Sequence, residues 1–159
     1  MRLRDNLYQR IIHILTGVVF IAMWFHIILV WGTLPDRIPT HFNAAGEIDG
    51  WGGKGTLLFG PVIGTVTLAV LLIVEHFPKA WNTGVKVTPL NQVFVYRTLK
   101  SMMVTLELSI LLIFWMTDLF IIWGTDAPIW LVPVILLLTF VPVVFFLVRL
   151  SVGSKKFRI

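Results

Sequence analysis

The sequence contains no cysteine, and only 13% of its 159 residues are charged. The absence of cysteine excludes disulfide bridges and thiolate metal sites. The charged fraction is far below the about 25% of ordinary soluble domains. Hydrophobic residues make up 57% of the chain, which is more apolar surface than one soluble domain of this length can bury. The composition therefore favours a membrane protein.

Catalytic motifs are also missing. The chain has no nucleophile–base arrangement, phosphate loop or metalloprotease helix motif, so we expect neither an enzyme nor a bound cofactor. The formal net charge of +5 would suit either nucleic acid or anionic lipid. Because the basic residues flank long apolar runs, they indicate membrane lipid as the partner and argue against nucleic acid.

Four apolar runs approach the length of about 20 residues that a helix needs to cross the hydrocarbon core. They cover residues 11–31, 57–74, 102–123 and 129–147. The sequence thus predicts an all-α integral membrane protein, a single domain of four transmembrane helices with connecting loops at 33–56 and 75–101. Pro133 and Pro142 fall inside the fourth run, so we expect that helix to be kinked.

The basic residues predict the orientation of these helices. Eleven of the 13 lie at the two ends of the chain or in the 75–101 loop, namely Arg2, Arg4, Arg10, Lys79, Lys86, Arg97, Lys100, Arg149, Lys155, Lys156 and Arg158. By the positive-inside rule both termini are then cytoplasmic and the 33–56 loop is extracytoplasmic. The first apolar run is too long for a cleaved signal peptide and lacks a small-residue ending, so we expect a retained helix.

The extracytoplasmic loop is dense in turn-forming residues but also carries Ile38, Phe42, Ile48 and Trp51. A flexible linker has little use for such side chains, so we expect an ordered cap on the outer ends of the helices. Candidate ligand-binding residues in it are Pro35, Thr40, His41, Asn43, Gly46, Glu47, Asp49 and Lys54. In one alternative these side chains satisfy the loop's own backbone groups. In another, His41, Glu47 and Asp49 bind a metal ion, although their spacing matches no standard site.

Titratable residues inside a membrane span are expensive and suggest function. Three candidates are His26, Glu107 and Asp118; His13 is expected at the lipid headgroups instead. Glu107 and Asp118 are eleven residues apart and therefore share one helix face. His26 and Asp118 each lie six residues before a glycine that ends a span, so they have similar depth. A hydrogen bond between them would be either a proton site or a static interhelical contact. Glu107 has no basic residue within reach on its own helix.

Two segments resemble a known family. Residues 34–54, LPDRIPTHFNAAGEIDGWGGK, look like the signature of the membrane family called domain of unknown function 1648. Residues 77–100, FPKAWNTGVKVTPLNQVFVYRTLK, resemble its second block, with Val-Thr-Pro and a Tyr-Arg pair. The family is related to the N-terminal region of SdpI-type bacterial immunity proteins. The resemblance implies a bacterial plasma-membrane protein that recognises an extracytoplasmic peptide or toxin.

The sequence therefore suggests two functions. The first is a binding or sensing protein of the SdpI-like immunity type, which recognises a peptide, toxin or lipid through its outer loop. The alternative is a small transporter, or a transporter accessory subunit, that uses His26, Glu107 and Asp118. A membrane protein partner or a homodimer is a further expectation. Gly60 and Gly64 allow close helix approach, either within the bundle or between two copies.

Overall fold

The computed structural model describes residues 4–156, which form four long helices and one two-stranded hairpin. The helices are α1 Leu7–Val30, α2 Phe59–Val74, α3 Gln92–Trp123 and α4 Leu131–Lys155. Each is long and apolar enough to cross a membrane, with α2 extended by the 3-10 helix η1, Lys54–Leu58. The mostly helical fold is that of a multi-pass membrane protein.

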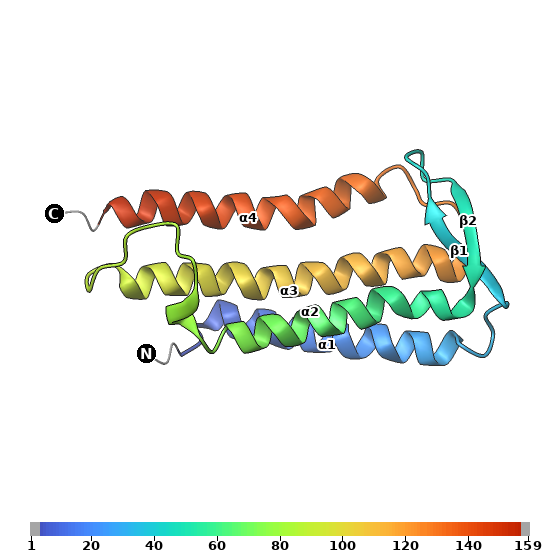
Figure 1. Ribbon diagram of the computed structural model, residues 1–159, viewed down its shortest axis with the longest axis horizontal. Helices are drawn as coiled ribbons and strands as arrows, with labels where there is room; N and C mark the ends of the chain where they lie inside the picture. Colours follow the sequence, from blue (N-terminus) through green and yellow to red (C-terminus); the bar gives the residue numbers. More distant parts are fainter. Residues whose placement is uncertain (1–3, 157–159) are drawn as a thin grey trace.

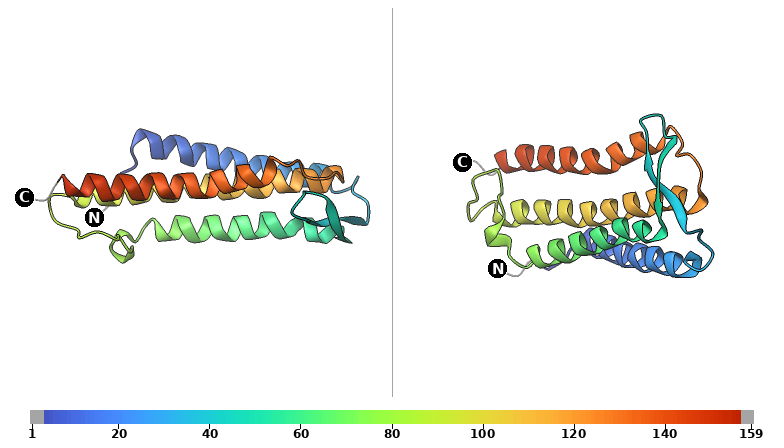
Figure 2. Two further views of the ribbon diagram at one scale, coloured as in Figure 1. Left: turned by 90° about the horizontal axis from the view of Figure 1, so that it is seen from above. Right: turned by 45° about the vertical axis from the view of Figure 1, so that its right-hand side comes forward.

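Helix α3 is the centre of the bundle. It packs against α1, α2 and α4, whereas α1 and α2 contact each other only weakly. Figure 1 shows α4 on one side of α3, with α1 and α2 on the other, and the views in Figure 2 separate α1 from α2. Its central position explains why α3 holds most of the buried polar side chains. The buried polar side chains on α3 are Thr98, Lys100, Ser101, Glu107, Ser109 and Asp118.

The loop between α1 and α2 contains the hairpin. Strand β1, Arg37–Phe42, pairs antiparallel with β2, Ile48–Gly53. The all-α prediction missed these strands because the segment is short and rich in glycine and turn-forming residues. Ile38 is 1% exposed and joins the core formed by the ends of α1 and α2. The hairpin therefore lies across one end of the bundle (Figure 1), here called the outer end after the predicted orientation.

The tip of the hairpin contacts the connection between α3 and α4. The Ala127 amide donates to the Gly46 carbonyl over 2.7 Å. The Ile48 amide donates to Asp126 Oδ1 over 2.8 Å. Gly46 has a φ of 87°, a left-handed conformation that glycine adopts without steric cost. These contacts join the first and last interhelical connections at the outer end.

Two helices continue beyond the predicted membrane spans. Helix α3 begins ten residues before residue 102, so the connection between α2 and α3 ends at residue 91 and not at 101. Helix α4 likewise continues to Lys155. A helix of 32 residues is about 48 Å long, whereas the hydrocarbon core is about 30 Å thick. Hydropathy marks the part of a helix inside the lipid, and the polar turns beyond it stay helical.

The two prolines of α4 and the two glycines of α2 have different structural roles. Pro133 is the third residue of α4, where its missing N–H needs no partner. Pro142 alone interrupts the helix interior, so any kink belongs to it.

Gly60 and Gly64 of α2 face α3: a Cβ on either would lie 3.1–3.2 Å from the Phe114 ring. Their close approach is therefore made within the bundle.

Candidate functional site

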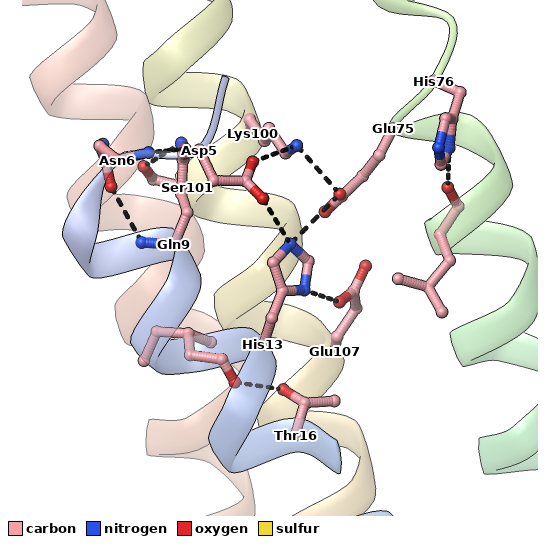
Figure 3. A network of polar contacts seen from close by, with 12 residues as sticks. Asp5, Asn6, Gln9, His13, Thr16, Glu75, His76, Lys100, Ser101 and Glu107 are labelled. Carbon is pink, nitrogen blue, oxygen red and sulfur yellow. Dashed lines mark hydrogen bonds and ion pairs between the residues drawn. The ribbon is translucent and has the colours of Figure 1, made fainter. Parts of the chain in front are cut away.

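Five ionisable side chains converge at the end of the bundle opposite the hairpin, the inner end (Figure 3). They come from three helices or their flanks. Asp5 precedes α1 and His13 lies on it, Glu75 caps the C-terminus of α2, and Lys100 and Glu107 lie on α3. We call this set the inner cluster.

His13 is the centre of the inner cluster. Its Nε2 lies 3.4 Å from Glu75 Oε2 and its Nδ1 lies 3.7 Å from Glu107 Oε2. Lys100 Nζ lies 2.5 Å from Asp5 Oδ1 and 3.4 Å from Glu75 Oε2. His13 Nε2 also lies 4.0 Å from Asp5 Oδ2. The imidazole therefore contacts three carboxylates, and the ammonium group contacts two of the same three (Figure 3).

Local structure positions these side chains. Asn6 and Gln9 form a reciprocal capping box at the start of α1, a device that satisfies two otherwise unpaired amides. Gln9 Nε2 also donates to the Arg97 carbonyl and to Ser101 Oγ of α3, over 3.2 and 3.1 Å. Because His13 is four residues after Gln9, it points from the same face of α1 toward α3.

Burial gives the inner cluster its chemical character. Glu107 is 1% exposed, Glu75 8% and Lys100 9%. Neither oxygen of Glu107, nor Oε1 of Glu75, has a hydrogen-bond partner within residues 4–156. One carboxylate oxygen of Glu75 and one of Glu107 lie within 4.8 Å of each other, a distance at which two negative charges repel. Buried charges without donors are costly, so the cluster is suited to holding protons or a cation.

A possible ligand set for a metal ion lies within the inner cluster. His13, Glu75 and Glu107 each present one ligand atom, and these atoms all lie within 4.8 Å of one another. Over the part of the chain that the structure describes, this is the only group of three such residues. The alternative set His41, Glu47 and Asp49 does not form such a group.

One contact of the inner cluster was not predicted. His13, which was expected at the lipid headgroups, lies beside the buried Glu107. Lys100, on the same helix as Glu107, pairs with Asp5 and Glu75, so the basic neighbour of Glu107 comes from α1. The only signal in the sequence was a histidine near the end of an apolar run. Glu75 and Lys100 gave none, because both were assigned to the inner connection.

At the outer end, the predicted binding residues mostly bond within the hairpin. Asn43 Oδ1 accepts from the amides of Ala45 and Glu47, and its Nδ2 donates to Glu47 Oε2. His41 Nδ1 lies 2.5 Å from Asp49 Oδ1 on the exposed surface. This arrangement fits the alternative in which the polar residues stabilise the loop itself.

Four predicted binding residues of the outer loop remain. Pro35 is exposed in the turn before β1. Lys54 Nζ lies 5.7 Å above the centre of the Trp31 ring and 4.0 Å from Asp36. Gly46 forms the docked tip. Thr40 differs from all of these because it lines a pocket beneath the hairpin.

The predicted bond between His26 and Asp118 is not formed. His26 Nδ1 accepts instead from Trp115 Nε1 over 3.3 Å. Equal depth was not sufficient, because Trp115 occupies the face of α3 that meets α1 at this level. Asp118 faces α2, where its Oδ1 is 3.3 Å from the position of a Cβ on Gly60.

The pocket beneath the hairpin has a volume of about 700 Å³. It lies between the hairpin, the start of α2 and the outer part of α3, and its lining is mostly apolar. The lining residues are Thr40, Gly55, Thr56, Leu58, Phe59, Gly60, Val62, Phe114, Thr117, Asp118 and Ile121. Asp118 is 3% exposed, and its Oδ2 has no hydrogen-bond partner among the residues described. We call this the outer pocket.

Comparison with known proteins identifies one part of the chain. Residues 18–65 match the domain of unknown function DUF1648. An uncharacterized protein of Archaeoglobus fulgidus is 33% identical over 57 residues, which cover 36% of this chain and 31% of that relative. The aligned part thus spans about a third of the relative's length. No solved structure matches the chain. The DUF1648 segment contains the outer half of α1, the hairpin and the start of α2, and it excludes every residue of the inner cluster.

Proposed function

We propose that this membrane protein binds an extracytoplasmic ligand in the outer pocket, with Asp118 as the polar contact at its base. The observation that carries the proposal is the buried Asp118 oxygen that lacks a partner in residues 4–156. A buried acceptor without a donor costs about 1–3 kcal/mol, and more when it is charged. A ligand that brings a donor to Asp118 recovers this free energy.

The lining determines the chemical class of the ligand. Phe59, Phe114 and Ile121 offer apolar contacts, and Thr40 and Thr56 add hydroxyl groups at the hairpin side. The volume of the outer pocket lies within the about 300–1,000 Å³ typical of small-molecule sites. We therefore expect an amphiphile with an apolar body and a cationic or N–H-donating group. A basic peptide, a peptide toxin and an amine-bearing lipid all belong to this class.

The fuller form of the proposal is an SdpI-like immunity role at a bacterial plasma membrane. It is supported by the resemblance of residues 34–54 to the domain of unknown function 1648, a family related to the SdpI-type proteins, and by the position of these residues over the outer pocket. Both termini are then cytoplasmic, and the hairpin faces the side from which a secreted toxin arrives. The same orientation is supported by the distribution of basic residues, because eleven of the 13 lie on the predicted cytoplasmic side.

A direct binding measurement tests the proposal. The full chain is placed in lipid nanodiscs and titrated with two probes, a fluorescent long-chain alkylamine and a fluorescent cationic amphipathic peptide. We expect at least one probe to bind more tightly than to empty nanodiscs, and Asp118→Asn to weaken this binding at least tenfold. Glu107→Gln is the matched control, because it alters the other buried carboxylate of α3 outside the pocket. Equal binding by Asp118→Asn, or none above empty nanodiscs, would refute the proposal.

A second candidate function is proton- or ion-coupled transport, alone or as an accessory subunit. It is favoured by the presence of two buried carboxylates on α3, Glu107 and Asp118, that both have oxygens without partners among the described residues. Eleven residues place them about 16 Å apart along the helix axis. Proton flux in liposomes that is lost in Glu107→Gln would support transport, and flux equal to empty liposomes would exclude it.

A further inference from the structure

We propose that His13, Glu75 and Glu107 bind one divalent transition-metal cation at the inner end of the bundle. The three ligands come from α1, the end of α2 and α3 (Figure 3), so the ion would join three helices. This site is separate from the outer pocket, which lies beneath the hairpin at the opposite end. It is also outside the segment that matches DUF1648.

The geometry of the ligand atoms supports a metal site. Bonds from Zn²⁺ to nitrogen or oxygen are about 2.0–2.2 Å, which puts neighbouring ligand atoms about 3.3–3.6 Å apart in a tetrahedral site. His13 Nε2 and Glu75 Oε2 are already 3.4 Å apart. The whole set lies within 4.8 Å, so small side-chain rotations close it. One imidazole and two carboxylates form a ligand set that suits Zn²⁺, Fe²⁺ or Mn²⁺.

The charge of the inner cluster supports a divalent ion. Asp5, Glu75 and Glu107 are three carboxylates, and Lys100 is the one lysine or arginine that forms an ion pair with them in residues 4–156. If the three carboxylates are ionised and the imidazole is neutral, two negative charges are left uncompensated. Negative charge held inside a membrane protein is expensive, and one divalent cation neutralises it.

The carboxylate oxygens of Glu107 are an independent observation that points to a bound cation. Both Glu107 oxygens lack a hydrogen-bond partner in the described part of the chain, although this residue is 1% exposed. If the cluster only stabilised helix packing by ion pairs, the ammonium group would be expected on Glu107. Lys100 lies instead on Asp5 and Glu75 at the edge. There Lys100 Nζ lies 3.4 Å from Glu75 Oε2, and it would compete with a metal ion for this oxygen.

The experiment uses the full chain, purified in detergent, stripped with a chelator and dialysed. Zn²⁺ and Mn²⁺ are titrated separately while heat and stoichiometry are measured. We expect at least one of the two ions to bind in a ratio of one per chain, and Glu107→Gln to weaken its binding at least tenfold. Asp118→Asn is the matched control on the same helix and should retain binding. The variant His41→Ala with Asp49→Ala should also retain it, because that exposed pair lies on the hairpin.

A second variant separates metal binding from a structural role of the cluster. Lys100→Met removes the cation that competes with the metal, so binding should become tighter. If the cluster were only an ion-pair clamp, this variant would lower the thermal stability of the protein with no gain in metal affinity. That result, absence of one-to-one binding by either ion, or wild-type affinity in Glu107→Gln would each overturn the proposal. None of these outcomes depends on ligand binding in the outer pocket, which Asp118→Asn tests separately.

Discussion

His13 of α1 and Glu107 of α3 approach within 3.7 Å, measured from Nδ1 to Oε2, although 94 residues separate them in the sequence. Gln9, one turn earlier on α1, bonds to Arg97 and Ser101 of α3. The first helix is therefore held to the central helix by polar contacts at its inner end. At its outer end the contact is largely apolar, through Met23 and Ile27. The polar contacts of α1 with α3 are therefore concentrated near the inner cluster.

The orientation of the chain can be tested by cysteine labelling. The native sequence has no cysteine, so a single substitution gives the chain one labelling site. A membrane-impermeant maleimide should label Asp49→Cys in intact cells, because the hairpin is predicted to be extracytoplasmic. It should label Lys86→Cys, an exposed residue of the inner connection, only after permeabilisation. The reverse pattern would contradict the predicted orientation.

Gly46→Ala should detach the hairpin tip. The φ of 87° at Gly46 disfavours alanine, and an added Cβ would lie 2.1 Å from the Ala127 carbonyl oxygen. The left-handed conformation alone costs about 1–2 kcal/mol, and the clash adds to it. Hydrogen exchange at the Ile48 and Ala127 amides should accelerate at least tenfold. Gly55→Ala, where a Cβ meets nothing within 4 Å, should leave both amides protected. Native protection in Gly46→Ala would show that the tip is not docked as described.

Gln9→Leu should loosen the attachment of α1 to α3. Gln9 is 0% exposed and uses its amide in the capping box and in the two bonds to α3. A lost cap costs about 1 kcal/mol, and an interhelical bond in a membrane about 0.6 kcal/mol on average. Unfolding in mixed micelles should therefore show a loss of about 1–2 kcal/mol. Gln92→Leu is the control, since Gln92 donates only a local bond to Pro89. Equal losses in the two variants would contradict this account.

Gly64→Leu should separate α2 from α3. A Cβ on Gly64 would lie 3.2 Å from both Leu111 Cδ2 and Phe114 Cδ2, and a longer side chain has no room between the helices. Overpacking of this kind costs about 1–3 kcal/mol, which unfolding in mixed micelles can measure. Gly17→Leu is the control, because a Cβ there has no neighbour within 4 Å. If both variants unfolded alike, close packing of α2 on α3 at Gly64 would be disproved.

Part of the candidate site was visible in the sequence. Glu107 and Asp118 stand out because carboxylates inside apolar runs are rare, and helical periodicity places them on one face. Their partners were not visible. Asp118 was paired with His26 from equal depth alone, but depth does not specify which faces of two helices meet. His13, Glu75 and Lys100 lie near the ends of apolar runs, where a charged residue is ordinary.

The four apolar helices were determined by the sequence alone, because a bilayer requires long apolar runs whose backbone bonds are satisfied within each helix. The hairpin, the true helix ends and the partners of each buried polar group were decided only by tertiary structure. Ile38 holds the hairpin in a core cluster with Met23 and Ile27 of α1, Leu57 of η1 and Leu111 of α3, which no local pattern encodes. The meeting of His13, Glu75 and Glu107 depends on the rotation and offset of three helices. Those quantities follow from packing around α3, not from the hydropathy of any one segment.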